Sequence, residues 1–249
     1  MYELIILISK YLFLFYIITF MWQSLKIILT QKNITRSDIK TCASRQYIMI
    51  ILFHVNSFLI LSFNNETAYF DLNTLLVCFL WIILFTLANF VLKLTYPGGN
   101  KLMWNSIFFL CDIGLVTLQR LNPNLAHKQL LWLFLGFLIV FLMPFALNFI
   151  KDLSKLKYLY LVLSLIMILT TFFFGDTAGG AKNWLTIKNF TFQPSELIKI
   201  LFILYLVAEL AKPKLKPINI IIPTIISGFV ILSLVFQKDL GSALIFFVT

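Results

Sequence analysis

Residues 74–95, TLLVCFLWIILFTLANFVLKLT, form an apolar run in which Lys93 is the only charged side chain. About 20 apolar residues are enough for a helix to cross the hydrocarbon core of a bilayer, so this stretch predicts a transmembrane helix. The rest of the chain is similar, because 61% of the 249 residues are hydrophobic and 12% are charged, against about 45–50% and about 25% in soluble domains. This composition excludes a water-soluble enzyme, a disordered chain and a disulfide scaffold.

Eight such runs follow one another along the chain, and a ninth begins near Leu240. We therefore expect an all-α fold: a polytopic transmembrane helical bundle with about eight complete spans and a truncated ninth. The stretch from Asp239 to Thr249 would extend only about 16 Å as a helix, which is short of the roughly 30 Å core, so we interpret the sequence as the front part of a longer protein. The eight runs cover residues 4–25, 46–63, 74–95, 102–119, 129–149, 158–175, 194–211 and 218–236.

The net charge of +10 indicates orientation rather than a nucleic-acid partner. Lys and Arg gather in the cytoplasmic loops of membrane proteins, and alternate connections of this chain hold 13 of its 20 basic residues. The connection 64–71, which lies between two of them, carries Glu66 and Asp71 and no base. We therefore predict a multi-pass membrane protein whose amino terminus lies outside. The basic connections cover residues 26–45, 93–101, 151–157 and 212–216.

The cysteines and histidines do not form a metal-binding pattern. Cys42, Cys78 and Cys111 lie far apart, and neither His54 nor His127 has a second ligand at metal-site spacing. We therefore predict no metal site of the His/Cys type.

Polar residues are expensive inside a membrane, so each one is a candidate for function. Asp112 and Arg120 are eight residues apart in one run and could share an interior face. Glu209, near the end of its run, can reach toward Lys212. Both signals are weaker than those of two polar connections on the predicted outer side.

The first outer connection, residues 175–199, reads GDTAGGAKNWLTIKNFTFQPSELIK. Its glycine pair permits a turn, and Pro194 suits the first turn of the next helix. Glu196 in that turn is favoured by the helix dipole, and it shares a face with Lys199. Spacing alone does not separate a binding site from a capped helix start with an interfacial Trp184.

The second outer connection runs from Gln237 to Ser242. Asp239 could cap the following helix, and Gly241 with Ser242 allows close helix packing, so by itself this is a turn with a capping carboxylate. Because both connections are predicted on one membrane face, their charges could line one outward cavity that suits an anionic headgroup. Those charges are Asp176, Lys182, Lys188, Glu196, Lys238 and Asp239.

Three motifs in these connections, GAKNWL (180–185), FQPSELIK (192–199) and QKDLGSA (237–243), resemble the SEDS family. This family comprises the FtsW/RodA/SpoVE proteins of bacterial division, elongation and sporulation. The resemblance covers about residues 102–249, which would be the amino-terminal part of the family core, and residues 1–95 would be three additional spans. Departures from the family pattern are Asn183 in place of Arg, Lys188 and Asn189 after the Trp, and Lys238 in place of Pro.

The resemblance implies a glycosyltransferase of the bacterial cytoplasmic membrane that polymerises lipid II at its outer face. The motifs themselves demand no cofactor; basic side chains or a divalent cation, Mg²⁺ or Mn²⁺, would stabilise the leaving pyrophosphate. The family's proposed catalytic Asp would lie beyond Thr249, so no residue here is assigned as catalytic. The implied partners are lipid II, membrane lipids and a class B penicillin-binding protein, with no nucleic acid.

From the resemblance we expect the motif residues to shape the substrate site. Two other functions stay open: a flippase for lipid-linked precursor, which needs a path to the cytoplasmic face, and a non-catalytic scaffold for division or elongation partners. The sequence does not separate division, elongation and sporulation. The predicted substrate-binding residues are Lys182, Trp184, Gln193, Ser195, Glu196, Lys199, Gln237 and Asp239, with Pro194 and Gly241 in structural roles.

Overall fold

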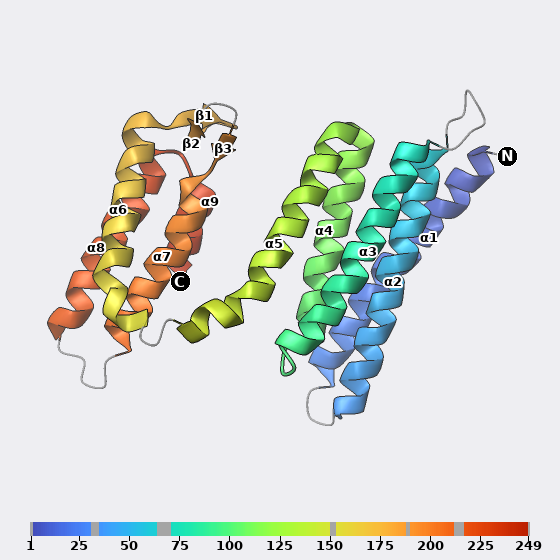
Figure 1. The fold of residues 1–249 in the computed structure, drawn as a ribbon, viewed down its shortest axis with the longest axis horizontal. Helices are drawn as coiled ribbons and strands as arrows, with labels where there is room; N and C mark the ends of the chain where they lie inside the picture. The colour runs from blue at the N-terminus through green and yellow to red at the C-terminus, as the bar shows by residue number, and fades with distance from the viewer. Residues whose placement is uncertain are drawn as a thin grey trace. The chain divides into compact units, whose positions relative to one another are not determined.

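The computed structural model describes residues 2–30, 35–63, 71–149, 153–187, 190–211 and 217–248. Almost all of the regular structure is helical, which confirms the all-α polytopic prediction (Figure 1). Six of the helices are long and apolar enough to cross a membrane, and a shorter apolar helix follows at 220–236. The elements are α1 (Tyr2–Leu29), α2 (Arg36–Ser62), α3 (Leu72–Thr95), α4 (Lys101–Leu121), α5 (Pro123–Phe149), η1 (Leu153–Leu156), α6 (Lys157–Phe174), β1 (Asp176–Ala178), β2 (Ala181–Ile187), β3 (Phe190–Phe192), α7 (Pro194–Leu210), α8 (Pro217–Phe236) and α9 (Leu240–Val248).

The chain folds as two compact units, residues 1–146 and 147–249. The sequence predicts a boundary between residues 95 and 102, where the resemblance to a known family begins. The division into compact units lies elsewhere, and the predicted boundary stays a prediction. Several residues considered above for their charge or for a departure from the family pattern lie outside the described residues. They are Lys32, Glu66, Lys151, Lys188, Asn189, Lys212, Lys214 and Lys216.

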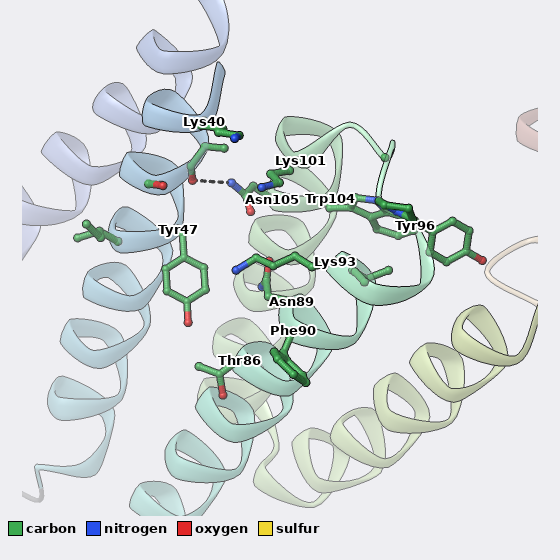
Figure 2. Close-up of a pocket in the computed structure, with 16 residues that line it drawn as sticks. Lys40, Tyr47, Thr86, Asn89, Phe90, Lys93, Tyr96, Lys101, Trp104 and Asn105 are labelled. Carbon is green, nitrogen blue, oxygen red and sulfur yellow. Dashed lines mark hydrogen bonds between the residues drawn. The ribbon is translucent and has the colours of Figure 1, made fainter. Parts of the chain in front are cut away.

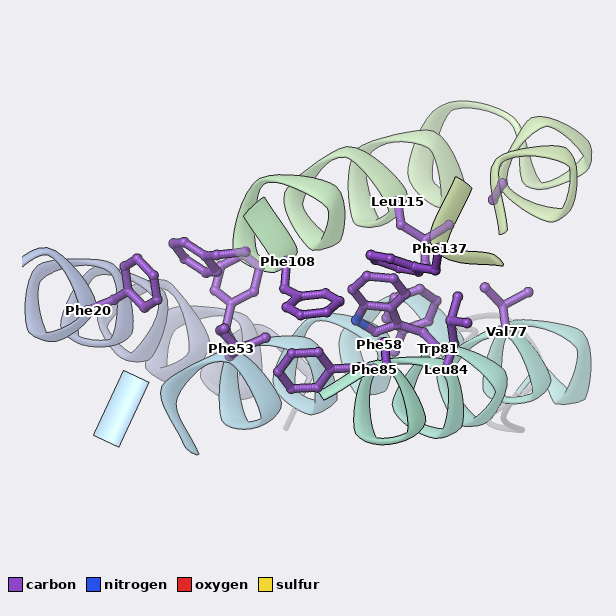
Figure 3. Packing of buried hydrophobic residues seen from close by; sticks show 14 of the residues in the cluster. Phe20, Phe53, Phe58, Val77, Trp81, Leu84, Phe85, Phe108, Leu115 and Phe137 are labelled. Atoms are coloured by element: carbon purple, nitrogen blue, oxygen red, sulfur yellow. The ribbon is translucent and has the colours of Figure 1, made fainter. Parts of the chain in front are cut away.

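In the first unit, α2 packs against α1, α3 and α4. Aromatic side chains fill the space between these helices, as Figure 3 shows. Phe85 of α3 meets Phe108 of α4 edge to face, with ring centroids 4.9 Å apart, and Trp81 stacks on Phe85. Edge-to-face and offset contacts between rings are the favoured geometries, so these rings fix how α3 and α4 approach.

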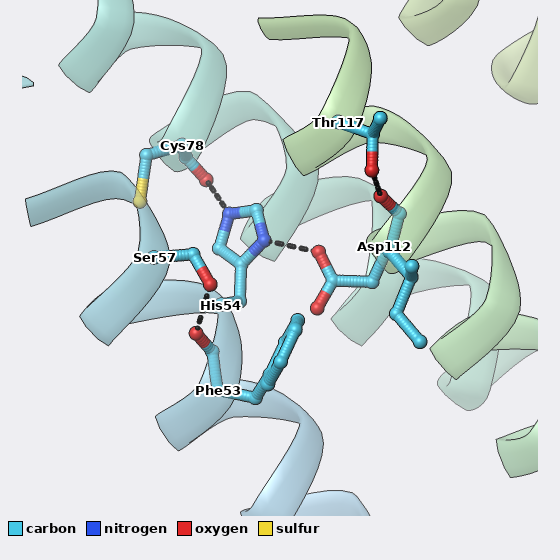
Figure 4. Close-up of polar contacts among 7 residues, drawn as sticks. Phe53, His54, Ser57, Cys78, Asp112 and Thr117 are labelled. Atoms are coloured by element: carbon cyan, nitrogen blue, oxygen red, sulfur yellow. Dashed lines mark hydrogen bonds and ion pairs between the residues drawn. The ribbon is translucent and has the colours of Figure 1, made fainter. Parts of the chain in front are cut away.

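A buried ion pair crosses this core between α2 and α4 (Figure 4). The His54 Nδ1 atom contacts Asp112 Oδ1, and His54 Nε2 contacts the carbonyl oxygen of Cys78 at 3.2 Å. A carbonyl only accepts hydrogen bonds, so Nε2 carries a proton and the second proton is shared between Nδ1 and the carboxyl. The pair has no net charge whichever atom holds that proton.

One expectation about intramembrane charges needs correction. Asp112 and Arg120 do not share an interior face, because Asp112 is fully buried beside His54 whereas the Arg120 side chain is exposed. Glu209 lies 2.7 Å from the Lys157 amino group at the start of α6. α6 and α7 lie against each other and bring these two groups within reach. Lys212, toward which Glu209 was expected to reach, lies outside the described residues.

In the second unit, α6 to α9 are joined at one end by a small antiparallel sheet in the order β1-β2-β3 (Figure 1). Gly179 and Gly180 form the tight turn between β1 and β2, and both have positive φ, at 60° and 87°. Two successive positive-φ residues are the requirement of a hairpin turn that suits twisted strands. The glycine turn was predicted, whereas the strands were not.

The predicted orientation can be tested with a membrane-impermeant thiol reagent applied to intact cells. Native Cys42 is a poor reporter because only 5% of its surface is exposed. Arg36→Cys and Asn124→Cys, each in a background without the native cysteines, place thiols at exposed positions at opposite ends of the first unit's helices. We expect labelling at position 124 and none at position 36 until the cells are opened. The reverse pattern would contradict the orientation.

Replacing His54 should destabilise the first unit strongly. His54→Ala leaves the Asp112 carboxyl buried without its partner, and removal of one partner of a buried pair costs about 3–5 kcal/mol. Denaturant titration in mixed micelles measures this loss. The exposed His127→Ala is the matched control and should change the free energy of unfolding little. A loss for His54→Ala no larger than that of the control would show that the pair contributes nothing.

Candidate functional site

Asp239 occupies the turn between α8 and α9, and three separate segments meet at its carboxylate. Its Oδ2 atom accepts hydrogen bonds from Asn183 Nδ2 of β2, at 2.6 Å, and from Gln193 Nε2 before α7, at 3.3 Å. Its Oδ1 atom accepts from the backbone N–H of Ser242 at 3.1 Å, which confirms the predicted cap of α9. The single carboxylate therefore ties the sheet, α7 and α9 together.

The environment of Asp239 favours its charged form. Burial, with 8% of its surface exposed, acts to raise the pKa of Asp239. The hydrogen bonds from Asn183 and from the Ser242 backbone outweigh this effect and hold the pKa below its ordinary value. Asp239 is therefore a carboxylate at neutral pH, and the groups that donate to it are neutral.

Two hydrogen bonds hold the turn against its surroundings. The Lys182 backbone N–H donates to the Gln237 carbonyl oxygen at 2.8 Å, and Nε2 of the buried Gln237 side chain donates to the Ile168 carbonyl oxygen of α6 at 3.4 Å. Lys238 adopts a positive φ of 59° in this turn, a strained position for a residue with a side chain. The family pattern has Pro there, and Pro cannot adopt a positive φ.

Lys182 and Trp184 both lie on β2, but their environments differ. The Lys182 amino group donates to the Phe172 carbonyl oxygen at 3.0 Å, so it caps the carbonyl end of α6, where a cation is favoured. Trp184 is half-buried and lies opposite Asp176 on β1.

Pro194 begins α7, as predicted, and places Glu196 in the first turn. The Lys199 amino group lies 2.6 Å from Glu196 Oε1, which confirms the expected pair. Glu196 is 62% exposed, so its carboxylate remains open to a ligand, and solvent screens most of the attraction between the two charges.

Two buried polar atoms beside this site form no hydrogen bond of full geometry within the described part of the chain: Asn183 Oδ1 and Ser195 Oγ. The Ser195 hydroxyl nevertheless lies close enough to Asp239 to help lower the pKa of its carboxyl. The side chains of Asn183 and Ser195 are at most 3% exposed. Such atoms are rare in native proteins, because an unmet hydrogen bond costs free energy. A polar group of a ligand or a water molecule could satisfy them.

The structure thus brings together Gln193 and Asp239, which were predicted, and Asn183, which was noticed only as a departure from the family pattern. Gly241 does not provide the expected close packing, because a Cβ atom there would meet no atom within 4 Å among the described residues. Nor do the described residues gather three His, Cys, Asp or Glu side chains that could hold a metal. The described residues therefore do not fit the carboxylate-rich shell of Mg²⁺ or Mn²⁺.

The chain is similar to known proteins over this part of its length. A family model of FtsW/RodA/SpoVE cell cycle proteins matches residues 100–249. A probable peptidoglycan glycosyltransferase FtsW of Borreliella burgdorferi is 30% identical over 182 residues, which cover 71% of this chain and 45% of the relative. The protein of the same description from Bacillus subtilis is 31% identical over 161 residues, 56% of this chain and 39% of the relative. The chain spans less than half the length of these relatives, and no solved structure matches it.

The low pKa of Asp239 predicts a pH-dependent contribution to stability. A carboxyl whose pKa is lower in the folded than in the unfolded protein stabilises the fold above its ordinary pKa, and this contribution is lost as the pH falls through the folded value. Asp239→Asn keeps a capping oxygen but removes the charge. The difference in unfolding midpoint between wild type and Asp239→Asn should be largest near neutral pH and shrink below about pH 4.

The control for this measurement is Asp176→Asn, which changes an exposed acid of the same sheet and should shift the midpoint little at any pH. A difference between wild type and Asp239→Asn that stays constant from neutral to acid pH would mean that the Asp239 charge does not stabilise the turn.

Proposed function

Because the chain belongs to the FtsW/RodA/SpoVE family of cell cycle proteins, we propose that it is part of a peptidoglycan glycosyltransferase that polymerises lipid II at the outer face of the bacterial cytoplasmic membrane. One observation carries the proposal. The three motifs of the family pattern, of which the third lies well after the first two in the sequence, converge on the Asp239 carboxylate through the bonds from Asn183 and Gln193. The similar relatives described as probable peptidoglycan glycosyltransferases support the reaction class.

The role that we propose for these residues is to hold and orient substrate. Lipid II presents a pyrophosphate and a disaccharide, so a site for it needs cations and hydrogen-bonding groups side by side. Lys199 supplies a cation next to the open carboxylate of Glu196. Asn183 and Ser195 supply polar atoms that form no hydrogen bond of full geometry among the described residues.

The proposed reaction forms one glycosidic bond and breaks the bond between the donor's anomeric carbon and the oxygen that links it to the pyrophosphate. A hydroxyl of the acceptor sugar attacks the anomeric carbon of the donor, a general base takes the hydroxyl proton, and lipid pyrophosphate leaves with the bridging oxygen. None of the described residues is assigned as that base. Asp239 is unsuited to the task, because it is buried and its oxygen atoms accept three hydrogen bonds from the protein.

Glu196 and Asp239 contribute differently under this proposal. Asp239 acts as a positioning residue, because it holds β2 and the start of α7 in place. Glu196 is exposed at the same end of α7 and can contact the substrate. We extend the proposal to a class B penicillin-binding protein as partner, since newly polymerised strands need a transpeptidase to cross-link them.

In the full-length protein, Glu196→Ala or Asp239→Ala should abolish lipid II polymerisation while membrane insertion stays normal. Polymerised strands are measured with purified protein and lipid II in detergent or proteoliposomes. Asp38→Ala removes an exposed acid from the first unit and serves as the matched control, for which we expect wild-type activity. Wild-type polymerisation in both site variants would leave these residues as structural caps.

The same preparation separates the proposal from its rivals. A wild-type protein that makes no polymer, but moves labelled lipid II across the bilayer of proteoliposomes, would be a flippase. A wild-type protein that does neither would be a scaffold. Either result would overturn the proposed glycosyltransferase.

A further inference from the structure

The first unit contains a cavity of about 620 Å³ that none of the family motifs touches. It lies between α2, α3 and α4, at the end where α3 leads into α4 through the turn 96–99 (Figure 2). The charge distribution of the sequence predicts that this end faces the cytoplasm. It is therefore distinct from the polar site around Asp239, which lies in the second unit and was predicted on the outer side.

The mouth of the cavity is basic. Lys40 lies near the start of α2, Lys93 in the last turn of α3, and Lys101 at the first position of α4. All three side chains are exposed, and none forms an ion pair within the described ranges. Among the described residues, the lining includes no Asp or Glu, so the field at the mouth attracts anions.

Below the lysines, the cavity becomes a groove whose walls are mostly apolar and aromatic, with Thr86 and Asn89 as polar members. Tyr47 and Ile48 follow Lys40 along one face of α2, and Thr86 and Phe90 precede Lys93 along α3. Figure 2 shows Lys93 reaching from α3 toward α2 above this stretch. At 1.5 Å per residue, the groove continues for about 10–12 Å from the lysines along both helices.

The walls are held in place by contacts that do not need a ligand. Asn105 of α4 donates to the Ala43 carbonyl oxygen of α2 at 2.9 Å. At Gly99 in the turn, a Cβ atom would come within 3.1 Å of Trp104 Nε1 and of the Tyr96 carbonyl oxygen, so the absence of a side chain lets Trp104 close the wall. The cavity is thus built into the packing of α2 and α4.

We propose that this cavity binds an anionic phospholipid. The phosphate sits among the amino groups of Lys40, Lys93 and Lys101, and an acyl chain follows the apolar groove between α2 and α3. Basic pockets between transmembrane helices at the cytoplasmic face suit such headgroups, and each Lys near an anionic surface contributes about 1 kcal/mol. A cation cluster alone would also suit inorganic phosphate, but the groove adds a surface that only an amphiphile can cover.

Binding to the purified full-length protein in neutral detergent tests this proposal. The probes are phosphatidylglycerol, phosphatidylcholine and inorganic phosphate, and native mass spectrometry gives the bound fraction. We expect phosphatidylglycerol to bind at least tenfold more tightly than phosphatidylcholine. Lys93→Gln with Lys101→Gln should weaken phosphatidylglycerol binding roughly thirtyfold.

Two further variants identify the site and the source of the phosphate. Lys26→Gln with Arg36→Gln removes two charges from the same end of the unit without touching the lining, and should leave binding within about twofold of wild type. Thr86→Phe fills the groove and should weaken phosphatidylglycerol binding while sparing inorganic phosphate. The proposal would be overturned if the two phospholipids bound equally well, or if both charge variants lost the same amount of binding. It would also be overturned if inorganic phosphate bound tightly and Thr86→Phe changed the binding of phosphate and of phosphatidylglycerol to the same extent.

Discussion

Hydrocarbon offers no hydrogen-bond partner, so every polar group at membrane depth has to be satisfied by the chain itself. The helices meet this requirement for the backbone. The side chains meet it in part through a few long-range contacts, among them the fully buried pair of His54 and Asp112. Some buried atoms, including Asp112 Oδ2, nevertheless have no hydrogen-bond partner among the described residues. Because a carbonyl and a carboxyl both face one imidazole ring, the proton count is fixed and the pair is neutral. The packing of α2 against α4 therefore depends on both residues being present, because burying either one without the other would cost free energy.

The same constraint explains why the irregular backbone is confined to the ends of helices. The sheet β1-β2-β3 and the turn before α9 lie at one end of the second unit, as Figure 1 shows. Asp239 then joins these segments with a charge that neutral donors stabilise. With Asn183 in place of the Arg of the family pattern, no cation neutralises that carboxylate among its hydrogen-bond partners. The negative charge of Asp239 is stabilised by neutral hydrogen-bond donors. Its stability therefore depends on the positions of these donors and not on an opposite charge.

The sequence predicted the features that depend on local chemistry. Apolar runs marked each helix, Pro194 marked the start of α7, and the three-residue spacing of Glu196 and Lys199 marked their pair. The contacts that organise each unit were not predictable in this way. His54 and Asp112 are 58 positions apart, and Asn183 and Asp239 are 56 apart, so no periodicity relates them. The strands were missed because two of them have three residues, too few to show an alternating pattern.

The basic residues show why a composition rule does not decide a function. The excess of Lys and Arg in alternate connections sets orientation whatever those side chains contact. In the folded chain, the predicted cytoplasmic lysines nevertheless differ in environment. Lys157 neutralises Glu209 between two helices, whereas Lys40, Lys93 and Lys101 converge on a cavity whose described lining residues include no acid. Lysines that only set the orientation in the membrane need not lie close together, and they need no apolar groove beside them. The presence of both features at one end of α2, α3 and α4 is the reason to assign these lysines a ligand.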